Sequence, residues 1–183
     1  EAQLAAQARA QLLSVAAVHE QALTQTRANL RFASYLLKQE GQVRVDQESQ
    51  SLVKAVNQQS SETLSVMVPA LYLGDSLLES STSLVDRIQK EADTLSTVFQ
   101  IIPQGMLRIS TNVRKADGTR ATGTFIPADS PVTQAVMAGT TYFGRAQVMG
   151  QWYLAAYEPL RDPDARIVGA LFTGVPEAEY QQG

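Results

Sequence analysis

The chain has 183 residues, of which 44% are hydrophobic and 18% are charged, and its net charge is −3. A chain of this length and apolar content folds as one domain with its own core, and the small negative charge excludes a nucleic-acid binder that depends on a basic surface. The absence of cysteine excludes disulfides, thiolate metal sites and cysteine nucleophiles.

Residues 1–39 predict one long helix. They contain neither proline nor glycine, and apolar or small residues recur at spacings of three and four, beginning with Leu4, Ala8 and Leu12. Gly41 is expected to end the helix. Because 1.5 Å per residue gives a rod of ~58 Å, longer than a small domain, we expect part of the helix to project and to pair with a second copy or continue into a membrane helix. The alternative is a helix that packs on the sheet over its whole length.

After Gly41 the hydrophobic period changes from that of a helix to that of a strand. The polar run 57–62 predicts a long hairpin loop between strands at 42–56 and 63–69, and residues 70–81 have no regular pattern. The later segments predict, in chain order, a helix at 84–92 with Ser83 as its cap, strands at 94–102, 106–113 and 120–127, a short helix at 130–138 that begins at Ser130–Pro131, and strands at 140–149, 152–160 and 166–175. The last three strands are joined by short turns, which predicts antiparallel pairing.

The sequence offers few candidate catalytic residues. His19 is the only histidine, it lies on the apolar stripe of the long helix, and there is no second histidine or any cysteine to complete a metal site. No nucleophile, zinc or phosphate-binding motif occurs. We therefore expect no catalytic residue, no metal and no cofactor, and we expect that the protein is not an enzyme.

A series of motifs follows in the C-terminal part of the chain: RISTNV (108–113), Asp117–Gly118, DSPV (129–132), Tyr142 with GRA (144–146), GQWY…YEPLRD (150–162) and GVP (174–176), with TSLVDRI (82–88) and TVFQ (97–100) upstream. In this order they resemble the Cache family of bacterial extracytoplasmic sensor domains, in its type 3/type 2 fusion form. The resemblance implies an α+β fold, in which a long N-terminal helix (1–40) and a PAS-like region (41–183) form one domain. It implies an antiparallel sheet of about five to six strands with short helices.

The resemblance also implies a function. The chain would be the periplasmic ligand-binding domain of a bacterial inner-membrane receptor, a methyl-accepting chemotaxis protein, whose flanking transmembrane helices lie outside this sequence. The alternative is a structural or dimerisation module without a ligand, or the indirect sensor of a membrane histidine kinase or diguanylate cyclase.

Arg145 is the first candidate for ligand binding, because it interrupts a strand of apolar and small residues. If Gly150–Gln151 is the hairpin turn, Arg145 lies opposite Ala156 and on the same sheet face as Trp152. A guanidinium among aromatic and small side chains suits a small carboxylate, because arginine offers a planar bidentate fork. The alternative is that Arg145 pairs with Glu158 or reaches solvent at a sheet edge.

Arg108 alternates with Leu107 and Ile109, so it is expected on the opposite face of its strand, together with Ser110. It is either a second cation of the pocket or the wet side of a half-buried strand. Thr111 is a hydroxyl donor in the same strand.

Ligands of the family are held by an arginine, tyrosines and a tryptophan, and Tyr142, Arg145, Trp152 and Tyr157 occupy the matching stretch of this sequence. The acidic residue typical of amino-acid-sensing members is absent. This favours a simple organic acid such as acetate, propionate, lactate or pyruvate.

Overall fold

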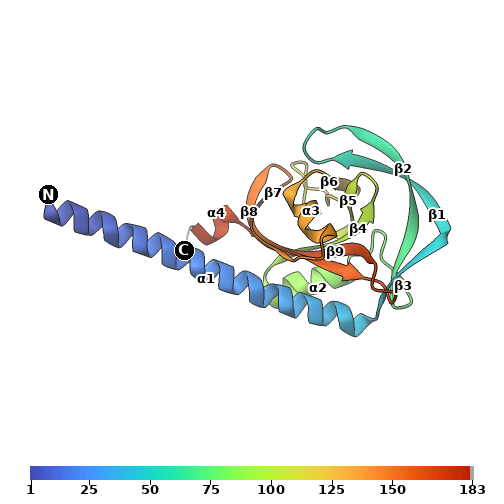
Figure 1. Cartoon of the computed structure of the whole chain (residues 1–183), viewed down its shortest axis with the longest axis horizontal. Coiled ribbons are helices and arrows are strands. Elements are labelled where there is room, and N and C mark those ends of the chain that lie inside the picture. The colour runs from blue at the N-terminus through green and yellow to red at the C-terminus, as the bar shows by residue number, and fades with distance from the viewer. Residues whose placement is uncertain (182–183) are drawn as a thin grey trace.

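The computed structural model describes residues 1–181 and has one nine-stranded sheet that curls around a short helix, with a long helix against its outer face (Figure 1). The helices are α1 (Ala2–Glu40), α2 (Ser83–Ala92), α3 (Pro131–Met137) and α4 (Glu177–Gln181). The strands are β1 (Val43–Asn57), β2 (Thr63–Leu73), β3 (Ser76–Leu77), β4 (Leu95–Ile102), β5 (Gly105–Thr111), β6 (Thr124–Pro127), β7 (Tyr142–Val148), β8 (Gln151–Arg161) and β9 (Ile167–Pro176).

The strand order is β3-β2-β1-β6-β5-β4-β9-β8-β7, and every pair is antiparallel except β1 with β6. The predicted α+β, PAS-like class is confirmed, but the prediction of about five to six strands is too low. The β1–β2 hairpin joins the central sheet through a short parallel pairing, in which Val56 and Asn57 lie opposite Thr124 and Phe125. Residues 70–77, which show no regular pattern in the sequence, complete β2 and form β3.

Each face of the sheet carries its own apolar cluster. The first cluster, on what we call the α1 face, contains Leu30 and Leu37 of α1 and Ile88 of α2. The second, on what we call the α3 face, contains Val132 and Val136 of α3. Burial of apolar surface on both faces stabilises the sheet, at about 25 cal/mol per Å² removed from water.

The helix α1 packs on the sheet only through its C-terminal half. Its buried residues lie between Thr26 and Leu37, whereas Leu4, Leu12 and Val15 remain 68–72% exposed. The N-terminal half extends beyond the domain on the same side as α4 (Figure 1). A helix packed over its whole length, the alternative raised by the sequence, is therefore wrong. No helix among the residues described is long and apolar enough to cross a membrane.

The predicted ends of two helices are confirmed. Gly41 follows the last residue of α1. Ser130 caps α3, because its hydroxyl oxygen accepts a hydrogen bond from the N–H of Val132 at 3.3 Å, and Pro131 occupies the first helical position. The cap fixes α3 over the α3 face, where the candidate site lies.

Candidate functional site

The β7–β8 hairpin turns at Met149–Gly150, where φ is +50° and +83°. These values are typical of a type I′ turn, whose two central residues both need positive φ. Arg145 consequently lies opposite Leu154. The prediction of a turn at Gly150–Gln151, with Arg145 opposite Ala156, is wrong by two residues in register. Because side chains alternate with period two, the shift leaves Arg145 and Trp152 on one face, as predicted.

Arg145 lies on the α1 face, at the edge of the sheet. Its Nε and Nη2 donate to Oε2 of Glu177 at 3.0 and 2.9 Å, and its guanidinium carbon lies 4.2 Å from the ring centroid of Trp152. The Arg145 side chain is 50% exposed. The ion pair that the sequence suggested with Glu158 forms instead with Glu177, the first residue of α4.

Arg108 is completely enclosed on the α3 face, with 1% of its surface exposed. Its Nη1 donates to the hydroxyl oxygen of Thr124 at 3.0 Å, and its guanidinium carbon lies 5.1 Å from the ring centroid of Phe99. Of the two alternatives raised by the sequence, the wet side of a half-buried strand is therefore wrong. A bulge in the β4–β5 pairing places Ser110 opposite Val98, so Ser110 does not share the face of Arg108 as predicted.

The guanidinium of Arg108 has donors without acceptors. Within residues 1–181, Nε and Nη2 of Arg108 and the hydroxyl of Tyr157 are buried and have no hydrogen-bond partner. No carboxylate in this part of the chain forms an ion pair with Arg108. An unpaired buried charge is costly, and native proteins retain one mainly where it has a task. We call Arg108 and Tyr157 the anion centre.

Burial shifts the pKa values of both groups of the anion centre. It lowers the pKa of Arg108 to about 10, while the neighbouring Tyr157 and Tyr153 act in the opposite direction. Burial also raises the pKa of Tyr157 above its ordinary value, and Arg108 partly offsets this rise. At neutral pH the centre therefore presents a protonated guanidinium and a neutral hydroxyl, both able to donate to an anion.

An open cavity of about 580 Å³ has lining residues from the α3 face, but Arg108 and Tyr157 themselves do not line it. Three of the residues predicted from the sequence, Tyr142, Arg145 and Trp152, are among those that line it. The others are Gln58, Gln59, Ile126, Ser130, Pro131, Val132, Ala146, Gln147 and Gly150. Three of the lining residues, Ile126, Val132 and Ala146, belong to the same apolar cluster as Phe99 and Tyr157, so the cavity and the anion centre share the α3 face.

The remaining candidates have local partners. The hydroxyl oxygen of Thr111 lies 2.6 Å from that of Thr97 and accepts the N–H of Val113 at 3.0 Å. The hydroxyl of Tyr142 donates to the backbone oxygen of Arg145 at 2.6 Å, and its ring meets that of Tyr157 edge-on at 6.1 Å. The structure thus brings Tyr142, Tyr157 and Arg108 to one face, and holds Thr111 in the packing between β4 and β5.

Met149 is a site residue that the sequence did not indicate. Its sulfur lies 3.8 Å from Nη1 of Arg108, although the two residues are 41 positions apart in the chain. A methionine at a turn carries no recognisable signal, and the predicted register assigned it to a strand.

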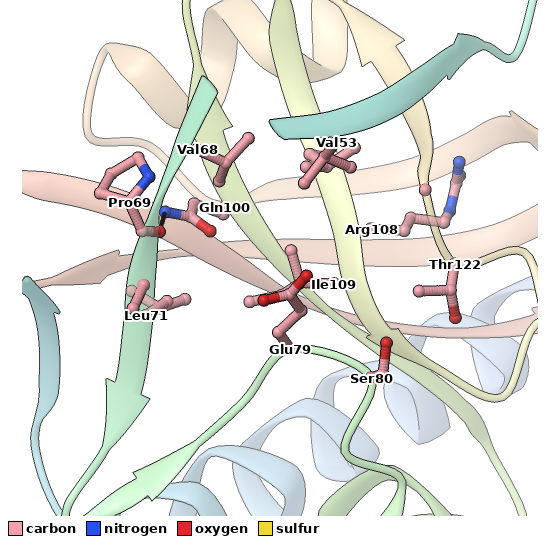
Figure 2. Close-up of a pocket in the computed structure, with 13 residues that line it drawn as sticks. Val53, Val68, Pro69, Leu71, Glu79, Ser80, Gln100, Arg108, Ile109 and Thr122 are labelled. Atoms are coloured by element: carbon pink, nitrogen blue, oxygen red, sulfur yellow. Dashed lines mark hydrogen bonds between the residues drawn. The ribbon is translucent and has the colours of Figure 1, made fainter. Parts of the chain in front are cut away.

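A second, smaller cavity of about 120 Å³ lies on the α1 face, between the β1–β2 hairpin and β4–β5. Apolar side chains such as Val68, Leu71 and Ile109 line it. In Figure 2 the guanidinium of Arg108 extends away from these side chains. The guanidinium therefore points out of this cavity, although Arg108 is one of its lining residues.

A long helix packed against a curled, largely antiparallel sheet, with a buried cation beside a cavity, defines a PAS-like ligand-sensing domain. The model of the Cache 3/Cache 2 fusion domain family matches residues 1–183, so the chain belongs to this family, as the resemblance indicated. Cache domains are extracytoplasmic sensor domains of membrane receptors, and they bind ligands rather than catalyse reactions.

Among solved structures, the chain is similar to the E. coli DcuS sensor domain, with 17% sequence identity and a TM-score of 0.42. The similarity covers 55% of this chain and 69% of that chain. No curated protein matches the chain.

Proposed function

We propose that this chain is the periplasmic ligand-binding domain of a bacterial transmembrane chemoreceptor, and that its ligand is a small carboxylate such as acetate, propionate, lactate or pyruvate. The observation that carries the ligand class is the anion centre, because Arg108 is buried and has no carboxylate partner among residues 1–181. A ligand carboxylate would supply the missing charge and accept from donors that no residue among 1–181 satisfies. Charge-assisted bonds of this kind are the strong ones.

The geometry suggests a division of roles. The carboxylate accepts from Nε and Nη2 of Arg108 and from the hydroxyl of Tyr157, the buried donors left without partners. Tyr142, Arg145 and Trp152 line the open cavity and form the rim through which a ligand enters. Thr111 supports the site from the β4–β5 packing. A ligand that binds one arrangement of the domain better than another shifts the balance between the two.

The first prediction concerns thermal unfolding in the presence of acetate, propionate, lactate, pyruvate, amino acids, purines and polyamines. A ligand at about 100 times its dissociation constant should add ~2.7 kcal/mol to the free energy of unfolding, which raises the melting temperature by about 5–10 °C. We expect this shift only with the short carboxylates.

The variants Arg108→Ala and Arg145→Ala locate the binding centre. We expect the short carboxylates no longer to raise the melting temperature of Arg108→Ala. Loss in Arg145→Ala with retention in Arg108→Ala would instead place the carboxylate at the β7 edge. A flat response of the unaltered protein to the whole panel would favour a module without a ligand.

The exposed half of α1 supports the dimer predicted from the sequence. Leu4, Leu12 and Val15 lie on one side of the helix, at spacings of eight and three residues, and are 68–72% exposed. Such a stripe is typical of a helix that pairs with another helix. We therefore propose that α1 pairs with α1 of a second copy.

The second prediction tests this pairing. In a sedimentation-velocity experiment, Leu12→Glu should lower the sedimentation coefficient from that of a dimer to that of a monomer. The reason is that a charge at the centre of a helix pair is desolvated without a partner. The matched control is Ala17→Glu, which adds the same charge on the opposite, exposed side of the helix and should leave the dimer intact. Equal sedimentation of the two variants would contradict the proposal.

A further inference from the structure

The turn of the β7–β8 hairpin places the Met149 side chain against one nitrogen of the Arg108 guanidinium. The Met149 sulfur lies 3.8 Å from Nη1 of Arg108, while the adjacent Gly150 lines the open cavity. A thioether is a weak acceptor, and a carboxylate is a much stronger partner for a guanidinium. A ligand acid that reaches Nε and Nη2 of Arg108 from the cavity therefore competes with Met149, which lies against Nη1, for contact with the same guanidinium.

The backbone of the turn favours rearrangement. Met149 adopts a φ of +50°, a backbone conformation that residues other than glycine, asparagine and aspartate rarely adopt. The turn also has few constraints, since β7 is an edge strand and nothing lies within 4 Å of a Cβ placed on Gly144 or Gly150. Across the cavity, the side-chain nitrogen of Gln58 donates to the backbone oxygen of Gln147 at 3.3 Å.

The same hairpin contacts the C-terminal end of the domain. Arg145 of β7 forms its ion pair with Glu177, which directly follows β9 and begins α4. Trp152 of β8 stacks against the Arg145 guanidinium. A displacement of the hairpin at Met149 thus moves the residues that position α4, and α4 lies beside α1 (Figure 1).

We propose that Met149 determines the affinity and size selectivity of the anion centre by occupying it in the free domain, and that its displacement by the ligand is passed to α4 through the Arg145–Glu177 pair. The inference rests on the proposed function and deepens it, since it names the residue that the acid must displace. Acids that are too short to push Met149 aside would leave α4 in its free arrangement.

The first test uses Met149→Ala and calorimetric titration with acetate, propionate, lactate and pyruvate. Removal of an internal competitor raises the fraction of binding-competent molecules, so the affinity of these acids should increase by roughly three- to tenfold. The matched control is Met137→Ala, because Met137 is half exposed on α3; its affinities should not change.

Trp152 provides a second readout, since it is the only tryptophan in the chain and lies three positions from Met149. Saturation with the acid that binds best should change its fluorescence in the unaltered protein, and this change should be lost or reduced in Met149→Ala. A purely structural role of Met149 would lower stability without raising affinity.

The link to α4 is tested with a fluorophore on Ala178→Cys, which is a unique label because the chain has no cysteine. Bound acid should change its emission, and adding Glu177→Gln should abolish this change while leaving the affinity for the acid within about twofold.

The outcomes separate the two proposals. Binding that depends on Arg108, with unchanged affinity in Met149→Ala and a silent Trp152, overturns the role of Met149 alone. Absence of binding of all four acids, in both the unaltered protein and Met149→Ala, overturns the ligand class and this inference with it. Binding that appears only in Met149→Ala supports both.

Discussion

Replacing Arg108 with methionine is expected to weaken the binding of small carboxylates strongly and, at the same time, to raise the thermal stability of the free domain. The two effects have one cause, which is that Arg108 is a buried cation with no anionic partner among residues 1–181. Loss of a charge-assisted contact should cost about 1.5–3 kcal/mol of binding free energy, or roughly 10- to 150-fold in affinity.

Stability should move in the other direction. Replacing a buried charge by an apolar side chain of similar volume is often stabilising, by about 1–4 kcal/mol. Thr124 loses one donor in the variant but keeps the bond from its hydroxyl to the backbone oxygen of Ala121 at 2.6 Å. We therefore expect the melting temperature of the ligand-free variant to rise by about 2–16 °C.

The control for this variant is Arg87→Met, in which the arginine lies on the surface of α2 and its side chain is 48% exposed. It should change neither binding nor stability by more than about 0.5 kcal/mol. An Arg108→Met variant that is less stable than the unaltered protein and still binds acids would show that the guanidinium is structural.

The pH dependence of binding supplies an independent check on the same group. The pKa of Arg108 is lowered by burial to about 10. The guanidinium is therefore protonated at neutral pH, and affinity for a carboxylate should weaken only as the pH rises through that value.

Gly105→Ala is expected to destabilise the domain by more than about 3 kcal/mol, measured by urea unfolding. Gly105 begins β5 with a φ of +148°, and a Cβ placed there would lie 1.9 Å from the backbone oxygen of Ile126. Neither backbone can yield, because β5 and β6 are paired at this point, with Gly105 opposite Pro127.

A control variant separates the effect of the steric clash from the effect of the backbone conformation. Gly118 also has a positive φ, of +87°, but no atom lies within 4 Å of its added Cβ. Gly118→Ala should therefore cost only the conformational term of about 1–2 kcal/mol. Equal losses in the two variants would contradict the close approach of β5 to β6 that positions Arg108.

Some features were determined by the sequence alone, because they depend on neighbouring residues. The long α1 follows from good helix formers without proline or glycine, and its end follows from Gly41. The start of α3 follows from Ser130–Pro131, and the antiparallel C-terminal strands follow from short turns. The order of motifs was sufficient to indicate the Cache family.

The anion centre was decided only by the tertiary structure. Alternation in β5 separates Arg108 from Leu107, but it does not show whether the face of Arg108 is covered. That face is closed by segments far away in the chain, including Phe99 and the turn at Met149. The bulge that turns Ser110 away from Arg108 likewise arises from pairing with β4.

Arg145 also shows that the sequence predicts the sheet face of a side chain but not its partner. The sequence placed it correctly on a sheet face with Trp152, yet its partner, Glu177, comes from a helix that follows two strands later. Local periodicity reports which face a side chain takes, whereas its burial and its partners depend on long-range packing that neighbouring residues do not encode.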